Sequence, residues 1–533
     1  MSVVPVIVSH GGKRYNIELD TSGTGEVFKY QLYSLTGVEP ERQKILVKGG
    51  QLKDETDLST LNIKPNHKFM MMGTPSSDTL KTPTQKPVFL EDLTEEQRAK
   101  QMGVIPAGLQ NLGNTCYMNS TLQALRFVPE LQEELLRYKA PAMAEYGLGG
   151  ANTDLTSALR DLYKQMGSTL TGFPPIAFLQ TLRTAFPQFA QRTREGRFEQ
   201  QDAEECWSQI VSQLRQNLKI QSGTAEAMAT TSFVDKYFAG KTTSVLKCDE
   251  ETPDELPVES EDTFLKLDCH ISGTTNAMRE GILAGLTEKI EKHSPTLDRG
   301  AMYTKTTRVT RLPKYLTCHF VRFYWKREIN KKTKIMRKVT FPFELDATEF
   351  CSDELKLKLI PVRDKIRNLR KDAFDRERAN KRARRNPAGA EDPIRTANRA
   401  GNSSVGTALA QMEEEQEAVT RALLSSEAPD WEKEISGLVD PEIVKDDGQN
   451  ATGLYELLGV VTHQGASSDS GHYCSFVKKK GGDGKTWYFF NDDKVTEVTE
   501  VKVEGLAGGG ESHSALICLY QAVPITSPVK EDA

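Results

Sequence analysis

The sequence predicts an α+β protein built from two domains, a small strand-rich domain followed by a larger mixed domain. The length of the chain, 533 residues, is the first indication, because single domains are seldom that long. The second is that residues 1–74 alternate short strand patterns with one helical pattern. The third is that the remainder contains both an amphipathic helix pattern, beginning at Cys116, and a strand–turn–strand pattern around His472.

The first domain opens on a β-hairpin pattern. The segment VPVIVSHGGKRYNIEL places Gly11 and Gly12 between two strand-like runs, as a tight hairpin turn requires. A strand, a helix and shorter strands complete the expected domain. The boundaries that we expect along the chain are residues 1–74, 75–104 (a linker), 105–523 (the second domain) and 524–533 (a tail).

The second domain contains a cysteine in a setting that favours reactivity. In GLQNLGNTCYMNSTLQALRF, Cys116 follows a run of Asn, Gly and Thr, and Met118 and Leu122 then recur at helical spacing. We therefore expect the thiol in the first turn of a helix, where unpaired N–H groups and the dipole lower the pKa of a cysteine. Asn111 in the preceding loop can donate an amide N–H to a developing oxyanion. A buried, inert cysteine is the commoner alternative for a lone cysteine.

A histidine about 360 residues later supplies the expected base. His472 opens a strand pattern in GHYCSFV, the glycine-rich KKGGDGK follows, and WYFFNDD predicts the returning strand. Folding this hairpin about Gly481–Gly482 places His472 directly opposite Asn491, close enough for the amide to hold the imidazole. A one-residue bulge would make Asp492 the partner instead.

Other histidines fit a catalytic role less well. His319 lies within the probable buried strand YLTCHFVRFYW, and we interpret it as structural. His463 is the closest rival, but it precedes the polar loop GASSDSG, residues 465–471, rather than a strand.

Three motifs in this order resemble those of the ubiquitin-specific proteases. GLQNLGNTCYMNSTLQAL resembles the Cys box of that family, and GHYCSFV with WYFFNDDKV resembles its His box. FEQQDAEECW, residues 198–207, resembles the QQDAxE motif that lies between them. The resemblance implies a papain-like fold with thumb, palm and fingers that grip ubiquitin.

The resemblance also implies a role for each matching residue. Cys116 corresponds to the nucleophile, and His472 to the residue that acts as general base and then as general acid. Asn491 corresponds to the third member of the triad, and Asp492 to a neighbouring acidic residue that some members need. Asn111 corresponds to the amide of the oxyanion hole.

Further matches imply contacts with ubiquitin. Asp202 corresponds to a carboxylate that contacts the C-terminal tail of ubiquitin, and we place Gln201 and Tyr473 beside it as ubiquitin-binding residues. Many members hold a zinc ion in the fingers through two Cys-x-x-Cys pairs. This chain has no such pair, and Cys248 and Cys269 stand alone, so we expect no metal and no cofactor. We expect strand pairing and packing to hold the fingers instead, for instance through TSVLKCDEE and FLKLDCHI.

The first domain resembles ubiquitin itself, which implies a β-grasp fold. RQKILVKGGQLKDETDLSTLNIKPNHKFMMMG is similar to the second half of ubiquitin. Leu46 and Met72 fall where ubiquitin carries two residues of its hydrophobic recognition patch, although a role in the core is the alternative. The chain continues as GTPSSD instead of ending in Gly-Gly, so we expect a docking module that is not conjugated to other proteins.

A ubiquitin-like domain ahead of such a protease resembles the proteasome-associated deubiquitinases of fungi and animals. The segment PVFLEDLTEEQ, residues 87–97, adds to this likeness. The resemblance implies that the domain binds the regulatory particle of the proteasome and that activity rises on docking. Loops such as residues 465–471 can cover the groove for the ubiquitin tail in that family.

Composition excludes several other classes. The net charge is −5, which gives no reason to expect nucleic acid as a partner. No signal-peptide pattern and no run of about 20 apolar residues is present, so we expect no membrane association. The eight cysteines lack the spacing of a disulfide framework, which favours the cytoplasm and the nucleus. We expect a monomer when the chain is free.

Residues 355–430 form an expected insertion in the second domain. A charged helical pattern contains KRARR at 381–385, and a polar loop and an acidic helical run around 413–417 follow. A nuclear-localisation signal, a contact with an acidic proteasome surface and a solvated helical arm are all compatible with this pattern.

Two other functions stay open from the residues alone. A catalytically silent scaffold could bind ubiquitin and the proteasome and act by occupancy. A papain-like protease could also act on a different ubiquitin-like modifier. The presence of Cys116, His472 and Asn491 argues against the scaffold, and Asp202 argues against the other modifier.

Overall fold

The computed structural model shows two compact units, Met1–Leu93 and Thr94–Ala533. The residues that it describes are 3–47, 50–73, 105–140, 154–169, 171–222, 229–250, 255–326, 331–385, 430–467, 470–481, 484–510 and 512–525. The expected linker at 75–104, the polar loop and second helix of the expected insertion, and most of the expected tail lie outside these residues.

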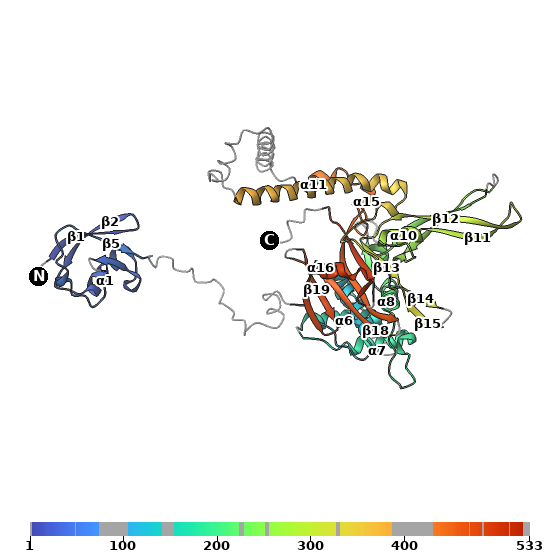
Figure 1. Ribbon diagram of the computed structural model, residues 1–533, viewed down its shortest axis with the longest axis horizontal. Helices are drawn as coiled ribbons and strands as arrows, with labels where there is room; N and C mark the ends of the chain where they lie inside the picture. The colour runs from blue at the N-terminus through green and yellow to red at the C-terminus, as the bar shows by residue number, and fades with distance from the viewer. Residues whose placement is uncertain are drawn as a thin grey trace, which may run out of the picture. The chain divides into compact units, whose positions relative to one another are not determined.

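The N-terminal unit has the β-grasp fold that the sequence predicts. Its strands are hydrogen-bonded in the order β2-β1-β5-β3-β4, with β1 antiparallel to β2 and parallel to β5 (Figure 1). Phe28 and Leu32 on one face of the helix pack into the hydrophobic core of the unit, and Gly37 ends the helix in a left-handed conformation. The bounds are β1 Val3–His10, β2 Lys13–Asp20, α1 Gly25–Thr36, η1 Pro40–Arg42, β3 Lys44–Val47, β4 Gly50–Gln51, η2 Leu58–Leu61 and β5 His67–Met72.

A large sheet forms the centre of the C-terminal unit. Within the described residues its strands follow the order β10-β13-β21-β17-β18-β19-β20, and β16 pairs with β17. Strand β17 is buried along most of its length, which agrees with its nearly continuous apolar sequence, LYELLGVV. The bounds are β10 Leu267–His270, β13 Tyr315–Val321, β16 Glu344–Asp346, β17 Leu454–Ser467, β18 Ser470–Lys478, β19 Thr486–Asn491, β20 Lys494–Thr499 and β21 Ser514–Ala522.

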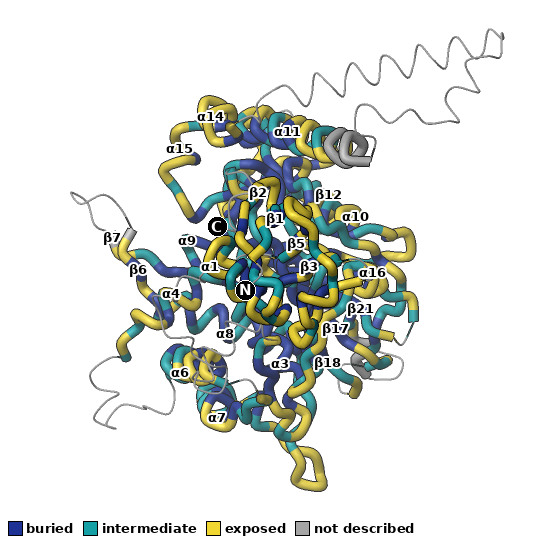
Figure 2. The backbone as a smooth tube through the Cα atoms, turned by 90° about the vertical axis from the view of Figure 1, so that its left-hand side faces the viewer, coloured by how far each residue is buried: buried dark blue, intermediate teal, exposed yellow. Residues whose placement is uncertain are grey.

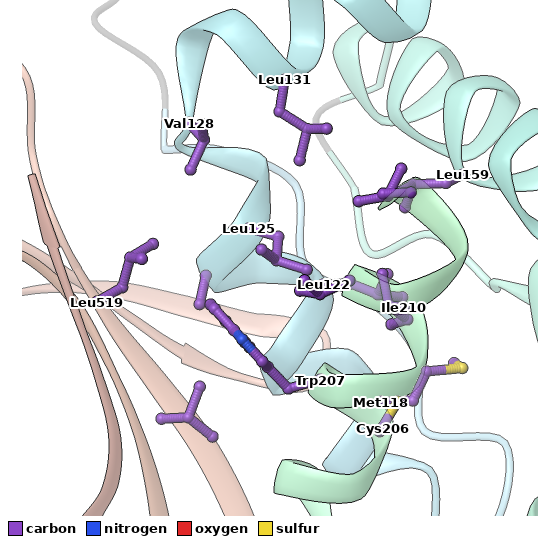
Figure 3. Close-up of a cluster of buried hydrophobic side chains, with 14 of the residues drawn as sticks. Met118, Leu122, Leu125, Val128, Leu131, Leu159, Cys206, Trp207, Ile210 and Leu519 are labelled. Carbon is purple, nitrogen blue, oxygen red and sulfur yellow. The ribbon is translucent and has the colours of Figure 1, made fainter. Parts of the chain in front are cut away.

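Helix α3, Cys116–Arg126, lies between this sheet and a group of helices. Figure 2 shows it in the colour of buried residues, whereas the peripheral α14 and α15 are largely exposed. Figure 3 shows Leu122 and Leu125 of α3 near Ile210 of α8, with Leu519 of the sheet on the opposite side. The helical group and its short strands comprise α4 Pro129–Arg137, α6 Leu155–Gly167, α7 Ile176–Ala185, η4 Pro187–Ala190, α8 Ala203–Asn217, β6 Lys219–Ser222, β7 Ala229–Ser232 and α9 Phe233–Tyr237.

A second sheet, in the order β11-β12-β8-β9, corresponds to the expected fingers. The sequence placed both TSVLKCDEE and FLKLDCHI in the fingers, and this prediction is wrong for the second segment. Cys248 does end β8, but Cys269 lies in β10 of the large sheet, fully buried in its core. The bounds are β8 Gly240–Cys248, β9 Val258–Phe264, β11 Thr287–Ser294 and β12 Arg299–Arg311, with α10 Met278–Gly285 beside β10.

The expected insertion begins with one long helix, α11, Asp353–Arg385. Its first half is not a solvated arm, because Leu359, Val362 and Ile366 are buried in the same core as the large sheet. The remaining elements are β14 Phe323–Lys326, β15 Lys331–Lys334, η5 Thr348–Phe350, α14 Trp431–Ser436, α15 Pro441–Val444, α16 Glu500–Glu504 and η6 Gly505–Ala507. None of the helices in the described part of the chain is long and apolar enough to cross a membrane.

Candidate active site

Cys116 is the first residue of α3, as the sequence predicts. The loop before it turns sharply, because Gly113 and Asn114 both adopt left-handed backbone conformations. The Thr115 hydroxyl accepts a hydrogen bond from the backbone N–H of Leu112, at 3.0 Å, which fixes the loop against the start of the helix. The side chain of Asn114 donates to the carbonyl of Phe198, at 2.9 Å, and so ties the loop to the FEQQDAEECW segment.

The thiol of Cys116 is more deeply buried than the sequence suggests. Its residue is only 2% exposed, and this burial, together with the negative charge of Asp492, raises its pKa to about 11. Backbone N–H groups of Tyr473 and Tyr117 lower the pKa by a smaller amount. The N–H groups at the start of the helix thus lower this pKa as the sequence predicts, but desolvation by burial outweighs them and the net shift is upward.

His472 and Asn491 meet as the sequence predicts, but through a different strand register. Nε2 of His472 lies 2.6 Å from Oδ1 of Asn491. Because an amide oxygen only accepts, Nε2–H is the donor, and Nδ1 keeps the lone pair that a general base needs. The backbone N–H of Tyr473, the next residue, is the group that contacts the Cys116 thiol. The residue that follows the base in β18 is therefore in contact with the cysteine.

The predicted register of this hairpin is wrong by two residues. Strand β18 pairs Ser475 with Phe490, so extending the pairing by one residue places Cys474, not His472, opposite Asn491. The thiol of Cys474 lies 3.7 Å from Oδ1 of Asn491, as this register requires. Because side chains alternate with a period of two, a two-residue shift keeps His472 and Asn491 on the same face. His472 and Asn491 therefore still contact each other, as a diagonal pair across β18 and β19.

Asp492 has a different position from the one predicted for a substitute partner of His472. Its Oδ2 lies 4.0 Å from Nε2 of His472, which is beyond hydrogen-bond distance. That same oxygen accepts from the Asn111 amide at 3.0 Å, and Oδ1 accepts from Asn119 at 2.8 Å. The carboxylate thus holds two amides on the Cys116 side of the site.

Asn111 is oriented at both ends of its amide. Its Oδ1 accepts from the backbone N–H groups of Gly113, at 3.0 Å, and Thr115, at 3.2 Å, while one N–H donates to Asp492. A carboxamide nitrogen carries two N–H groups, and the second is not used in these bonds. That geometry fits the predicted function of Asn111 as an oxyanion donor.

The loop before Cys116 and the end of β19 contact each other through backbone. The N–H of Leu109 donates to the carbonyl of Asp492 at 2.9 Å. A Cβ atom at Gly108 would lie 2.5 Å from the carbonyl oxygen of Asp493, so only glycine fits this approach. Only glycine fits at position 172 as well, because a Cβ atom added there would lie 2.7 Å from the Cβ atom of Asp493.

The residues predicted to bind ubiquitin have different environments. Asp202 caps α8 by accepting from the Glu204 N–H at 2.9 Å, and both it and Gln201 are half-buried. Tyr473 is buried, and its ring lies 4.7 Å from that of His463. Contact between ubiquitin and the Tyr473 side chain does not fit this burial, because the ring is part of the hydrophobic core that joins the large sheet to the helices.

Leu46 and Met72 in the N-terminal unit lie on one face of its sheet. Leu46 pairs with Met70 across β3 and β5, and Met72 lies two residues further along the same face. These three side chains are exposed, at 45%, 56% and 49% for Leu46, Met70 and Met72, so they are not core residues. We call them the sheet-face patch. Large apolar groups gathered at the surface mark a binding site more often than isolated ones do.

Both rival histidines are packed in the large sheet. His319 in β13 lies 2.8 Å from the carboxylate of Asp268, a structural pair as expected. His463 lies within β17, which continues past it to Ser467, so the prediction that a loop rather than a strand follows His463 is wrong. Both β17 and β18 extend into GASSDSG, the segment predicted to be a loop. Among the described residues, no group of three or more His, Cys, Asp or Glu side chains could hold a metal ion.

Sequence reasoning missed Asn119 as a residue of the site. This buried side chain donates to Asp492 and lies 3.2 and 3.3 Å from the carbonyls of Leu109 and Gln110. It therefore connects α3, the preceding loop and the end of β19. A polar residue among apolar ones on the buried side of an amphipathic helix was the signal that could have identified it.

Comparisons with known proteins agree with this site. The chain matches the ubiquitin carboxyl-terminal hydrolase family over residues 107–520 and the ubiquitin family over residues 6–76. Ubiquitin carboxyl-terminal hydrolase 6 of Schizosaccharomyces pombe is 45% identical, over 98% of this chain and 100% of the relative. Ubiquitin carboxyl-terminal hydrolase 7 of Arabidopsis thaliana is 39% identical, over 95% and 96%. Ubiquitin carboxyl-terminal hydrolase 14 of Caenorhabditis elegans is 32% identical, over 96% and 91%.

The fold and these matches define a thiol-dependent hydrolase specific for ubiquitin. The chain belongs to the ubiquitin carboxyl-terminal hydrolase family and is a deubiquitinating enzyme with an N-terminal ubiquitin-like domain. The predicted family, fold class and enzyme class are confirmed. The predicted roles of individual residues stay predictions, supported by the geometry described above.

Proposed function

We propose that this enzyme removes ubiquitin from conjugates held at the proteasome, and that docking there raises its activity. The observation that carries the proposal is one chain with both a complete thiol site and a ubiquitin-like domain bearing an exposed apolar patch. The site provides hydrolysis, and the patch provides a surface through which the enzyme can be recruited.

The chemistry follows from the positions of the side chains. The thiolate of Cys116 attacks the carbonyl after the last glycine of ubiquitin, and the second N–H of Asn111 stabilises the resulting oxyanion. His472 takes the thiol proton, gives it to the leaving lysine amine, and then activates water to hydrolyse the thioester. Asn491 orients the imidazole without adding a negative charge, as in the Cys-His-Asn form of the triad.

The resting state of the site supports low activity in the free enzyme. A cysteine whose pKa is raised to about 11 contains little thiolate at neutral pH, and only the thiolate is nucleophilic. Opening of the site to ubiquitin would reduce the desolvation that causes this shift. Docking that favours the open form would therefore increase turnover.

Location and oligomeric state belong to the same proposal. All eight cysteines have free thiols, which suits the reducing cytoplasm and nucleus. We infer a monomer in the free state and a complex with the regulatory particle of the proteasome when docked. Fractionation of cells and sedimentation of the purified chain test these two points.

The experiment uses proteasomes stripped of deubiquitinases and loaded with a ubiquitinated substrate. Wild-type enzyme should release free ubiquitin, and Cys116→Ala should bind the proteasomes equally well but release none. Equal effects of both proteins on substrate degradation, with no ubiquitin released by either, would instead support a regulator that acts by occupancy.

A further inference from the structure

The base of the β14–β15 hairpin contains two buried cations. Arg322 immediately precedes the hairpin, and its guanidinium donates to the carbonyls of Ala515, at 2.7 Å, and Arg337, at 2.9 Å. Lys334, the last residue of the hairpin, is only 4% exposed. Its ammonium group donates to the carbonyl of His463 in β17, at 2.7 Å. The hairpin is thus attached to the large sheet through these side chains.

Burial of the Lys334 ammonium is costly. Desolvation and the nearby positive charge of Arg322 lower its pKa to about 8. Among the described residues Lys334 forms no salt bridge, and its ammonium group is held by a backbone carbonyl. Burying a cation that is held mainly by a carbonyl destabilises the folded state. A requirement for the attachment of the hairpin to β17 explains why residue 334 is a lysine and not an apolar residue.

The His463 side chain also contacts the β14–β15 hairpin, through Phe323. Phe323 pairs with Lys334 across the hairpin, and its ring lies edge-on to the His463 imidazole with centroids 5.3 Å apart. Neither ring nitrogen of His463 makes a hydrogen bond of normal geometry, although the ring is fully buried. Burial and the charge of Lys334 lower its pKa to about 3, so the ring is neutral. The neutral imidazole is therefore held here by its packing and by a contact with the backbone of Ser470, which raises its pKa by a smaller amount.

His463 also lies against the residues on both sides of His472. A Cβ atom added to Gly471 would lie 2.7 Å from Nε2 of His463, and the Tyr473 ring lies 4.7 Å from the imidazole. A continuous series of contacts thus runs from the hairpin, through His463, to the two neighbours of the catalytic histidine. Tyr473 is also the residue whose N–H contacts the Cys116 thiol.

We propose that Lys334 and His463 are positioning residues that connect the β14–β15 hairpin to the strand segment carrying His472. The attachment fixes where β18 begins, and thereby the distance between the His472 imidazole and the Cys116 thiol. The inference rests on His472 as the general base of the proposed function. A misplacement of that base by a fraction of an ångström reduces the rate of proton transfer more than it reduces ubiquitin binding.

The test measures kcat and KM with ubiquitin bearing a C-terminal fluorophore, after the active fraction has been titrated with a ubiquitin-based covalent probe. Lys334→Met keeps most of the side-chain volume but removes the donor, and we expect kcat to fall roughly tenfold with KM changed by less than about twofold. Lys334→Arg restores a donor and should recover part of kcat. Lys338→Met, an exposed lysine four residues further on, is the matched control and should resemble wild type.

A second pair of variants tests the shape of His463. His463→Phe keeps a flat ring and should retain most of kcat, whereas His463→Ala should lose about as much as Lys334→Met. A merely structural role would lower the melting temperature and the titrated fraction but leave kcat per active site unchanged. That result for both Lys334→Met and His463→Ala would overturn the inference. If wild type were active and Cys116→Ala inactive in the same assay, the proposed hydrolysis would still stand.

Discussion

At the scale of single residues, Asp492 determines how the site is assembled. Its carboxylate holds Asn111 and Asn119, whereas its neighbour Asn491 is the one of the two that lies within hydrogen-bond distance of the His472 ring. In the proposed mechanism, the two adjacent residues therefore act on different parts of the reaction. There Asn491 orients the base, and Asp492 orients the amide that donates to the oxyanion.

The protonation of Cys116 leads to the first prediction. Because its pKa is raised to about 11, the thiolate fraction of the free enzyme should increase about tenfold per pH unit throughout the range below that value. Alkylation of Cys116 by iodoacetamide, followed by peptide mass spectrometry, should therefore become steadily faster from pH 7 to pH 10. A plateau reached below pH 8 would show that His472 and the helix dipole keep the thiol ionised.

Asn119 leads to the second prediction. Asn119→Ala leaves the Asp492 carboxylate and two loop carbonyls without this donor, which should destabilise the enzyme by about 1–3 kcal/mol. Asn119→Asp has the same shape but places a second carboxylate beside Asp492, so it should be the more damaging change. Chemical denaturation and active-site titration measure both effects. An Asn119→Asp protein as stable and as active as wild type would disprove the role given to this amide.

At the scale of elements, the sequence predicts which side chains lie close together better than it predicts the register of the paired strands. The β18–β19 hairpin is clear from alternating and aromatic residues, but KKGGDGK permits several turns and does not fix which residues face each other. The contact of His472 with Asn491 was predicted correctly because a two-residue error preserves the face of the strand. The sequence does not reveal that β17 continues past His463, because the GASSDSG segment into which it runs is polar and typical of a loop.

Long-range packing accounts for the other differences. The burial of Cys116 results from α3 packing against β18 and α8, which are distant in sequence, so its pKa could not be predicted from the helix start alone. The charged α11 is anchored by Leu359 and Ile366, whose burial depends on partners elsewhere in the chain. The β-grasp domain was easier to predict, because its strands and helix follow one another closely.

The sheet-face patch leads to the third prediction. Leu46→Ser combined with Met72→Ser should weaken proteasome binding at least tenfold, because desolvation of apolar side chains contributes much of the affinity of such patches. Hydrolysis of a ubiquitin fluorophore by the free enzyme should not change. Tyr30→Ser, at a similarly exposed apolar position on α1, is the control. Equal loss of binding in the control would locate the docking surface on the helix instead.

At the scale of the whole molecule, two units share the proposed work. The ubiquitin-like unit has its own hydrophobic core, so it can fold without contributing residues to the thiol site. The catalytic unit contains Cys116, His472, Asn491 and Asp492.

Removal of residues 1–74 should therefore leave the basal turnover of a ubiquitin fluorophore within about twofold of the full chain, while abolishing stimulation by proteasomes. A truncated protein that is folded by circular dichroism yet inactive would contradict this division.

The central claim is that Cys116 hydrolyses ubiquitin and that docking raises its activity. The most direct measurement is the hydrolysis of ubiquitin with a C-terminal fluorophore, with and without proteasomes whose own deubiquitinases have been inactivated. We predict slow turnover by the free chain, a sharp increase when proteasomes are added, and no turnover by Cys116→Ala in either case. Turnover that is equally fast without proteasomes would contradict activation by docking, and turnover that persists in Cys116→Ala would contradict the site itself.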